Sequence, residues 1–104
     1  MQIKTSLKED LKKKIYLVSY NLSGKTDNKE KLLAELKKYP GWCKLWDGQW
    51  FICSSDNADA ICNNLKKVLN SADWLFVSNV NTDRMGLMSG NAVEWLENVY
   101  KKIN

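Results

Sequence analysis

The sequence predicts an α+β fold in one domain, and three observations lead to this prediction. Segments with strand-like and helix-like patterns alternate along the chain, with no internal repeat and no linker between them. Asp47-Gly48 separates two runs of strand-forming residues, which is the strongest short-range signal of a β-hairpin. The chain has 104 residues, of which 44% are hydrophobic and 27% charged, as expected for one globular domain.

The chain before the first strand is polar and rich in lysine. Its Ser6-x-x-Glu9 segment has the pattern of a capping box, with few apolar residues after it. We therefore expect residues 1–14 to form a basic N-terminal arm or a short helix, and residues 15–104 to form the single domain. Residues 15–22 follow as a strand whose two faces are both largely apolar, which predicts a central position in the sheet.

Three helices and one more strand are predicted further along. A helix begins near Asp27-x-x-Glu30 and ends at Pro40-Gly41, and a second helix is capped by Asp56 or Asn57. Residues 73–80 form the next strand, and Asn91-x-x-Glu94 caps the last helix. The apolar residues at helical spacing predict the buried stripes: Leu32, Leu33, Leu36 and Tyr39, then Ala58, Ile61, Leu65, Val68 and Leu69, then Ala92, Trp95, Leu96, Val99 and Ile103.

The predicted hairpin sorts its side chains into two faces. With Asp47 and Gly48 as a two-residue turn, the predicted cross-strand pairs are Trp46 with Gln49, Leu45 with Trp50, Lys44 with Phe51, Cys43 with Ile52 and Trp42 with Cys53. One face then carries Cys43, Leu45, Trp50 and Ile52, which we expect to lie under the helices. The other face carries Trp42, Lys44, Trp46, Gln49, Phe51 and Cys53.

The order strand, helix, hairpin, helix, strand is that of a split βαβ unit. It predicts a ferredoxin-like βαββαβ sandwich with an appended C-terminal helix. Right-handed crossovers predict that the first and third strands lie side by side and parallel, with two helices on one sheet face. The other face must then be wet, covered by the last helix or the arm, or buried in a dimer.

Several motifs together resemble a known family. They are S-Y-N-L at the end of the first strand, W-x-x-x-x-D-x-x-W in the hairpin, S-A-D-W-L-F-V in the last strand and A-V-E-W-L in the final helix. This pattern resembles the SinR-like small proteins, which are similar to the CRISPR-associated adaptation nucleases and to virulence-associated protein D. The resemblance implies a ferredoxin-like protomer that forms a homodimer through its sheets, with a role in prokaryotic or viral defence or counter-defence.

The resemblance also implies a metal-binding aspartate at the end of the first strand, where this chain has Asn21. A neutral amide is a poorer ligand than a carboxylate for a hard divalent cation. The chain has no histidine, and its three cysteines lack C-x-x-C spacing. We therefore expect no catalytic residue, no metal and no cofactor. The enzymatic alternative is a residual Mg²⁺-dependent nuclease in which Asp27, Asp47 or Asp56 replaces the lost carboxylate.

A first candidate binding site follows from the predicted parallel strands. If both strands lead into helices at the same sheet edge, the positive ends of two helix dipoles converge there. Such an edge would hold a phosphate of a nucleotide or nucleic acid. The residues concerned are Asn21, Ser23, Lys25, Thr26, Ser54 and Ser55, and the alternative is that they are ordinary caps and turn formers.

A second candidate site is the outer face of the hairpin. Trp42, Lys44, Trp46 and Phe51 form an aromatic and basic surface, on which bases stack in nucleic-acid-binding sheets. The alternative is that a dimer partner or the last helix buries these rings.

These patterns predict a non-catalytic module that binds nucleic acid or a nucleotide-type ligand. The net charge of +4 suits a polyanionic partner. A protein-interaction module acting through the outer sheet face is the other alternative. The chain lacks an apolar run of the length needed to span a membrane and an apolar signal segment, so we expect a cytoplasmic protein with no membrane partner.

Overall fold

The computed structural model describes residues 3–5, 13–24 and 28–103, which form five strands, three α-helices and one short 3-10 helix. The elements are β1 (Ile3–Thr5), β2 (Lys14–Asn21), α1 (Asn28–Leu36), β3 (Gly41–Trp46), β4 (Gln49–Ser54), α2 (Ala58–Leu65), a 3-10 helix (Lys66–Val68), β5 (Trp74–Asn79) and α3 (Gly90–Ile103). The predicted α+β class is confirmed.

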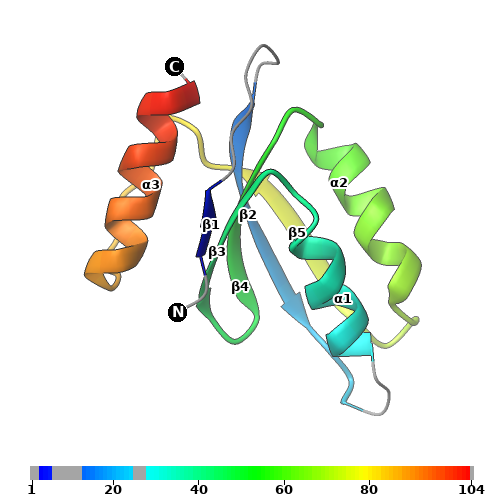
Figure 1. Cartoon of the computed structure of the whole chain (residues 1–104). Coiled ribbons are helices and arrows are strands. Elements are labelled where there is room, and N and C mark those ends of the chain that lie inside the picture. The colour runs from blue at the N-terminus through cyan, green and yellow to red at the C-terminus, as the bar shows by residue number, and fades with distance from the viewer. Residues whose placement is uncertain (1–2, 6–12, 25–27, 104) are drawn as a thin grey trace.

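The strands form one sheet in the order β1-β3-β4-β2-β5, and every neighbouring pair is antiparallel. Helices α1 and α2 lie on one side of this sheet and α3 lies on the other (Figure 1). We call the α1/α2 side the inner face and the α3 side the outer face. Strand β5 forms one edge of the sheet, and β2 is central, as predicted.

The inner face carries the larger of two apolar clusters. Fully buried Trp50 and Ile52 of β4 lie beside Val18 of β2, and α1 and α2 cover them with apolar residues at helical spacing. Asn57 caps α2 as predicted, because its side-chain Oδ1 accepts a hydrogen bond from the Ala60 backbone N–H at 2.8 Å. The buried helix residues include Leu32, Leu36, Ile61 and Leu65, as the sequence predicts.

The outer face carries the second cluster, and α3 covers it. Trp95 stacks on Phe51 with 6.2 Å between ring centroids. The residues buried with them are Ile15, Cys43, Cys53, Ala92, Leu96 and Val99. Burial raises the pKa of the Cys43 and Cys53 thiols to about 11, so both sulfurs stay protonated and unreactive near neutral pH. The predicted inward stripe of the last helix is confirmed for four of its members: Ala92, Trp95, Leu96 and Val99.

The hairpin turn forms where the sequence predicts it, but the predicted pairing is wrong for most of β3. Gly48 adopts φ +89°, and a Cβ there would lie 2.9 Å from the Tyr20 carbonyl oxygen. Trp46 pairs with Gln49 as expected, whereas Lys44 pairs with Trp50 because a bulge at Leu45 shifts the register. Cys43 therefore lies opposite Phe51 on the outer face, and Trp42 joins Trp50 on the inner face, 5.4 Å away between ring centroids.

Three further expectations need correction. Strands β2 and β4 are antiparallel and not parallel, because a hairpin intervenes between the two crossovers and reverses the chain. Ser89 and not Asn91 caps α3, since the Ser89 Oγ accepts from the Ala92 backbone N–H at 3.3 Å. In the N-terminal arm, Ile3–Thr5 forms strand β1 against β3, so this part is not helical. The capping box predicted at residues 6–9 lies outside the described residues.

Asp73 joins two connections of the chain at the start of β5. Its Oδ1 accepts from the Ser23 backbone N–H at 2.8 Å, and its Oδ2 accepts from the Asn28 side chain and the Asn70 backbone N–H, both at 3.0 Å. The N–H of Asn70, the N–H of Ser23 and the Asn28 amide stabilise the carboxylate, which lowers the pKa of Asp73 from 3.8 to about 2. This one carboxylate therefore holds the chain before α1 against the α2–β5 connection.

Asp73 should make the stability of the fold dependent on acid pH. Because its pKa is lower in the folded chain, the carboxylate contributes its full stabilisation above 3.8, and this is lost as the pH falls toward 2. We expect Asp73→Asn to be less stable than the wild type at neutral pH and to lose less stability between those two values. Urea unfolding at a series of pH values measures both effects. The exposed carboxylate variant Asp83→Asn is the control, and an unchanged acid profile for Asp73→Asn would contradict the assignment.

Candidate functional site

The residues of the predicted anion site are not brought together. Asn21 ends β2, whereas Ser54 lies opposite Lys14 at the other end of that strand. The starts of α1 and α2 are therefore at opposite ends of the sheet, and the prediction that they converge is wrong. Buried Ser54 has a local role, because its Oγ accepts from the Asp56 backbone N–H at 3.0 Å, and Ser55 is exposed beside it. Lys25 and Thr26 lie outside the described residues.

The four residues of the predicted hairpin surface do not share one face. Trp42 and Lys44 lie on the inner face, where the Lys37 ammonium sits 5.5 Å from the centroid of the half-buried Trp42 ring. Phe51 is on the outer face but is buried under Trp95. Of the four, only Trp46 is both on the outer face and exposed, at 54%.

Trp46 belongs to a line of side chains that crosses four strands of the outer face. Trp46 pairs with Gln49, Gln49 with Ser19, and Ser19 with Phe76. The Gln49 Nε2 donates to the Ser19 Oγ at 2.7 Å, so the two polar members are fixed to each other. We call this line the aromatic row: Trp46, Gln49, Ser19 and Phe76. Phe76 is 66% exposed, and the adjacent Trp74, opposite Asn21, is 73% exposed.

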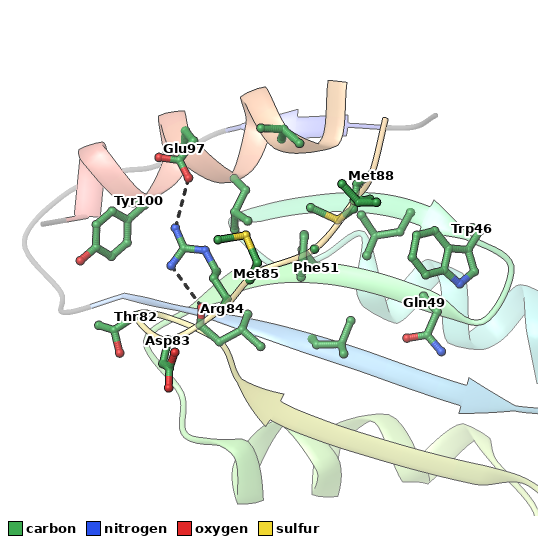
Figure 2. Close-up of a pocket in the computed structure, with 17 residues that line it drawn as sticks. Trp46, Gln49, Phe51, Thr82, Asp83, Arg84, Met85, Met88, Glu97 and Tyr100 are labelled. Atoms are coloured by element: carbon green, nitrogen blue, oxygen red, sulfur yellow. Dashed lines mark hydrogen bonds and ion pairs between the residues drawn. The ribbon is translucent and has the colours of Figure 1, made fainter. Parts of the chain in front are cut away.

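A groove of about 810 Å³ runs from the aromatic row toward α3. Figure 2 shows Trp46 and Gln49 at one end of it and Tyr100 and Glu97 of α3 at the other. Phe51 and Leu17 of the sheet line it, and the loop after β5 crosses it with Met85 and Met88. Met85 and Leu87 are both 99% exposed. Helix α3 thus covers only part of the outer face, and the aromatic row lies on the part that stays open.

Arg84 anchors the loop that crosses the groove. Its guanidinium donates to the backbone carbonyls of Val80 (3.3 Å) and Asn81, and it lies 3.5 Å from the Glu97 carboxylate (Figure 2). The same group sits 4.8 Å from the centroid of the Tyr100 ring. These contacts of the Arg84 guanidinium therefore hold the loop against α3.

A smaller hollow of about 450 Å³ lies at the turn end of the sheet. Tyr20, Asn21 and Gly24 line it together with the hairpin turn. The Lys29 ammonium and the Asp47 carboxylate lie 3.0 Å apart at this hollow, and the hydrogen bond to Asp47 raises the pKa of Lys29. The pair is exposed, so it adds little to stability.

The groups that the nuclease hypothesis needs are dispersed. Asp47 is paired with Lys29, Asp56 follows β4 at the far end of the sheet, and Asp27 lies outside the described residues. Over residues 3–5, 13–24 and 28–103, no group of three or more His, Cys, Asp or Glu side chains is placed to hold a metal ion. The nuclease hypothesis remains a sequence prediction.

Over the same described residues, no helix has the length and apolarity to cross a membrane.

The sequence reasoning missed Trp74 and Phe76. A signal for them exists, because Trp74, Phe76 and Ser78 alternate with Leu75 and Val77 in residues 74–78. Alternation of period two indicates a strand with two unlike faces. Leu75 and Val77 pack on the inner cluster, which leaves the aromatic rings on the outer face.

Comparison with known proteins gives no relative. No protein family, curated protein or solved structure matches this chain.

Proposed function

We propose that this protein is a non-catalytic binding module that holds single-stranded nucleic acid on the aromatic row. The single observation that carries the proposal is the row itself: exposed rings at both ends, with a hydrogen-bonded glutamine and serine between them on the two middle strands. Aromatic side chains on an open sheet face are a known platform for unpaired bases.

We also propose the ferredoxin-like class for the domain. The strand order β3-β4-β2-β5 and the packing of α1 and α2 on one face support it, with β1 and α3 as additions. The resemblance to SinR-like proteins, with its implied place in defence biology, is retained as part of the proposal on the motifs that suggested it.

The dimensions of the row suit bases. Three strand spacings separate Trp46 from Phe76, or about 14 Å, which leaves room for bases on both rings and for a nucleotide between them. Stacking is worth about 1–3 kcal/mol per base and is tolerant of sequence. Gln49 and Asn21 present amide groups that both donate and accept hydrogen bonds, so they complement base edges of any type.

The charges of the chain determine the expected strength and salt dependence of nucleic-acid binding. The net charge of +4 draws a polyanion toward the chain, but the members of the row are uncharged and Arg84 is committed to the loop. Few phosphates would be neutralised directly. Affinity should therefore fall only weakly with salt, since the slope follows the number of phosphates contacted.

Fluorescence titration with single-stranded oligonucleotides tests the proposal. We expect quenching of tryptophan emission, and a loss of affinity of about 5- to 150-fold for Trp46→Ala and for Phe76→Ala, which corresponds to one stacked base each. Leu87→Ala is the matched control, since Leu87 is exposed but outside the row. Absence of quenching by any oligonucleotide would reject nucleic acid and leave a protein partner for this face.

The second candidate is a protein-interaction surface, and the loop after β5 favours it. Met85 and Leu87 extend the exposed apolar surface beyond the row. Exposed apolar patches rich in aromatic residues and methionine are typical of protein interfaces. If the oligonucleotide titration fails, this candidate is the one to pursue.

A further inference from the structure

Among the described residues, no strand pairs with the edge of the sheet at β5. The Val80 backbone N–H donates to the Ile15 carbonyl at 2.9 Å, which makes Ile15 and Val80 a hydrogen-bonded pair. Hydrogen-bonded and non-hydrogen-bonded pairs alternate along an antiparallel ladder. Leu75, Val77 and Asn79 are therefore the non-bonded partners of β2, and their N–H and C=O groups point away from it, toward the open side of β5.

This edge lacks the features that usually protect edges. Trp74–Asn79 contains no proline and no charged residue, and its register with β2 is continuous. Natural proteins commonly block an exposed edge with lysine, proline or a bulge. An unprotected strand of this length is a template for another strand.

The spacing of the outward groups matches a second copy of the same strand. In an antiparallel pair centred on Val77, Val77 faces Val77 of the second copy, and Leu75 faces Asn79 on each side. Every outward N–H and C=O of the three residues then finds a partner. A two-fold axis with an identical strand therefore satisfies the edge completely.

Helix α2 is compatible with this axis. The Asn64 side chain donates to the Tyr39 hydroxyl, which follows α1, so Cys62 lies on the flank of α2 that faces away from α1. Because α2 packs against β5, this flank is on the side of the β5 edge. The chain enters α2 from the end of β4 and runs from the other end of α2 to the start of β5. The middle of α2 therefore lies beside the middle of β5, where Val77 is. On the same flank, Asp59 and Lys66 stand on either side of Cys62, so a two-fold axis would bring each near the opposite charge of the other copy.

We propose that two copies of this chain pair antiparallel along β5, which joins their sheets and places two aromatic rows on one continuous outer face. The partner is a second copy because the edge is uncharged and complementary to itself, while the flanks of α2 carry charges of opposite sign. The assembly does not depend on the nucleic-acid function, although it would double the surface available to a strand.

Sedimentation velocity across a wide concentration range tests the pairing. We expect a dimer whose dissociation constant rises at least about tenfold in Asn79→Pro, because proline removes the outward N–H twice per dimer and its ring meets the partner backbone. Asn79→Ala is the matched control and should dimerise like the wild type. Trp46→Glu should also dimerise normally, since Trp46 lies three strands away from the edge.

Cross-linking gives a second readout that does not need a substitution in the strand. A short bis-maleimide should trap the wild-type dimer through Cys62, and Cys62→Ser should abolish the product, because Cys43 and Cys53 are buried. A monomer at all concentrations would overturn the proposal. A dimer that is broken by Trp46→Glu but not by Asn79→Pro would overturn it too, in favour of face-to-face packing. Oligonucleotide quenching is scored separately, so either proposal can fail alone.

Discussion

Replacing Trp50 with alanine should lower the free energy of unfolding by about 3–5 kcal/mol, the cost usually found for removing a buried aromatic side chain. Trp50 is fully buried in the middle of the inner cluster, against Trp42 and under α1 and α2. Because the indole packs against Trp42 within this cluster, its removal leaves a cavity in the core. A loss of this size is a large part of the stability of a small domain, which is typically about 5–15 kcal/mol. Urea unfolding followed by far-UV circular dichroism measures it.

Trp74→Ala is the matched control for Trp50→Ala. The same residue type is replaced, but the Trp74 ring is mostly exposed, so we expect a change within about 0.5 kcal/mol. If both variants lost similar stability, the assignment of inner and outer faces would be wrong.

Replacing Trp95 with alanine should have the second large effect, again about 3–5 kcal/mol. Trp95 attaches α3 to the outer face through its stack on Phe51, beside Ile15 and Cys53. Without this ring, α3 loses the centre of its contact with the sheet. Hydrogen exchange should then show faster exchange of the α3 backbone amides, while the amides of β2 and β4 keep more of their protection.

Val93→Ala is the control within the same helix, because Val93 is 42% exposed and is not one of the buried residues of α3. It should leave the exchange of α3 nearly unchanged. Uniform acceleration over the whole chain in Trp95→Ala, with α3 no faster than β2, would show instead that α3 and the sheet unfold as one unit.

The sequence predicts the elements well because each has a strong local cause. The Asp47-Gly48 turn needs residues that tolerate positive φ, and Gly48 has φ +89°. The stripes of α1, α2 and α3 follow from apolar residues at helical spacing, and the buried residues Leu36, Ile61 and Val99 belong to them. These features depend on neighbours within one turn of the chain.

The register of the hairpin could not be predicted in the same way. A bulge at Leu45 adds one residue to β3, and nothing in W-C-K-L-W shows where an extra residue is accommodated. Its consequence is large, because a shift of one residue moves every earlier side chain to the other face. Cys43 and Trp42 exchanged faces for this reason, and Lys44 of the predicted hairpin surface moved to the inner face with Trp42.

The candidate site depends on relations between distant strands. Phe76 and Trp46 lie in one line only because β4 and β2 stand between their strands with matching register. The anion site failed for a related reason: the assumed parallel pairing of β2 and β4 put Asn21 and Ser54 at one edge, and the antiparallel sheet separates them. The order and direction in which the strands pair decide both results, and the local sequence pattern does not contain this information.

Hydroxyl-radical footprinting of the five tryptophans, with and without a single-stranded oligonucleotide, tests the central claim most directly. The claim is that α3 covers one part of the outer face and leaves the aromatic row open for binding. We predict rapid oxidation of Trp46 and Trp74 in the free protein, little oxidation of Trp50 and Trp95, and protection of Trp46 when the oligonucleotide is added. Rapid oxidation of Trp95, or a Trp46 that reacts equally with and without the oligonucleotide, would contradict the claim.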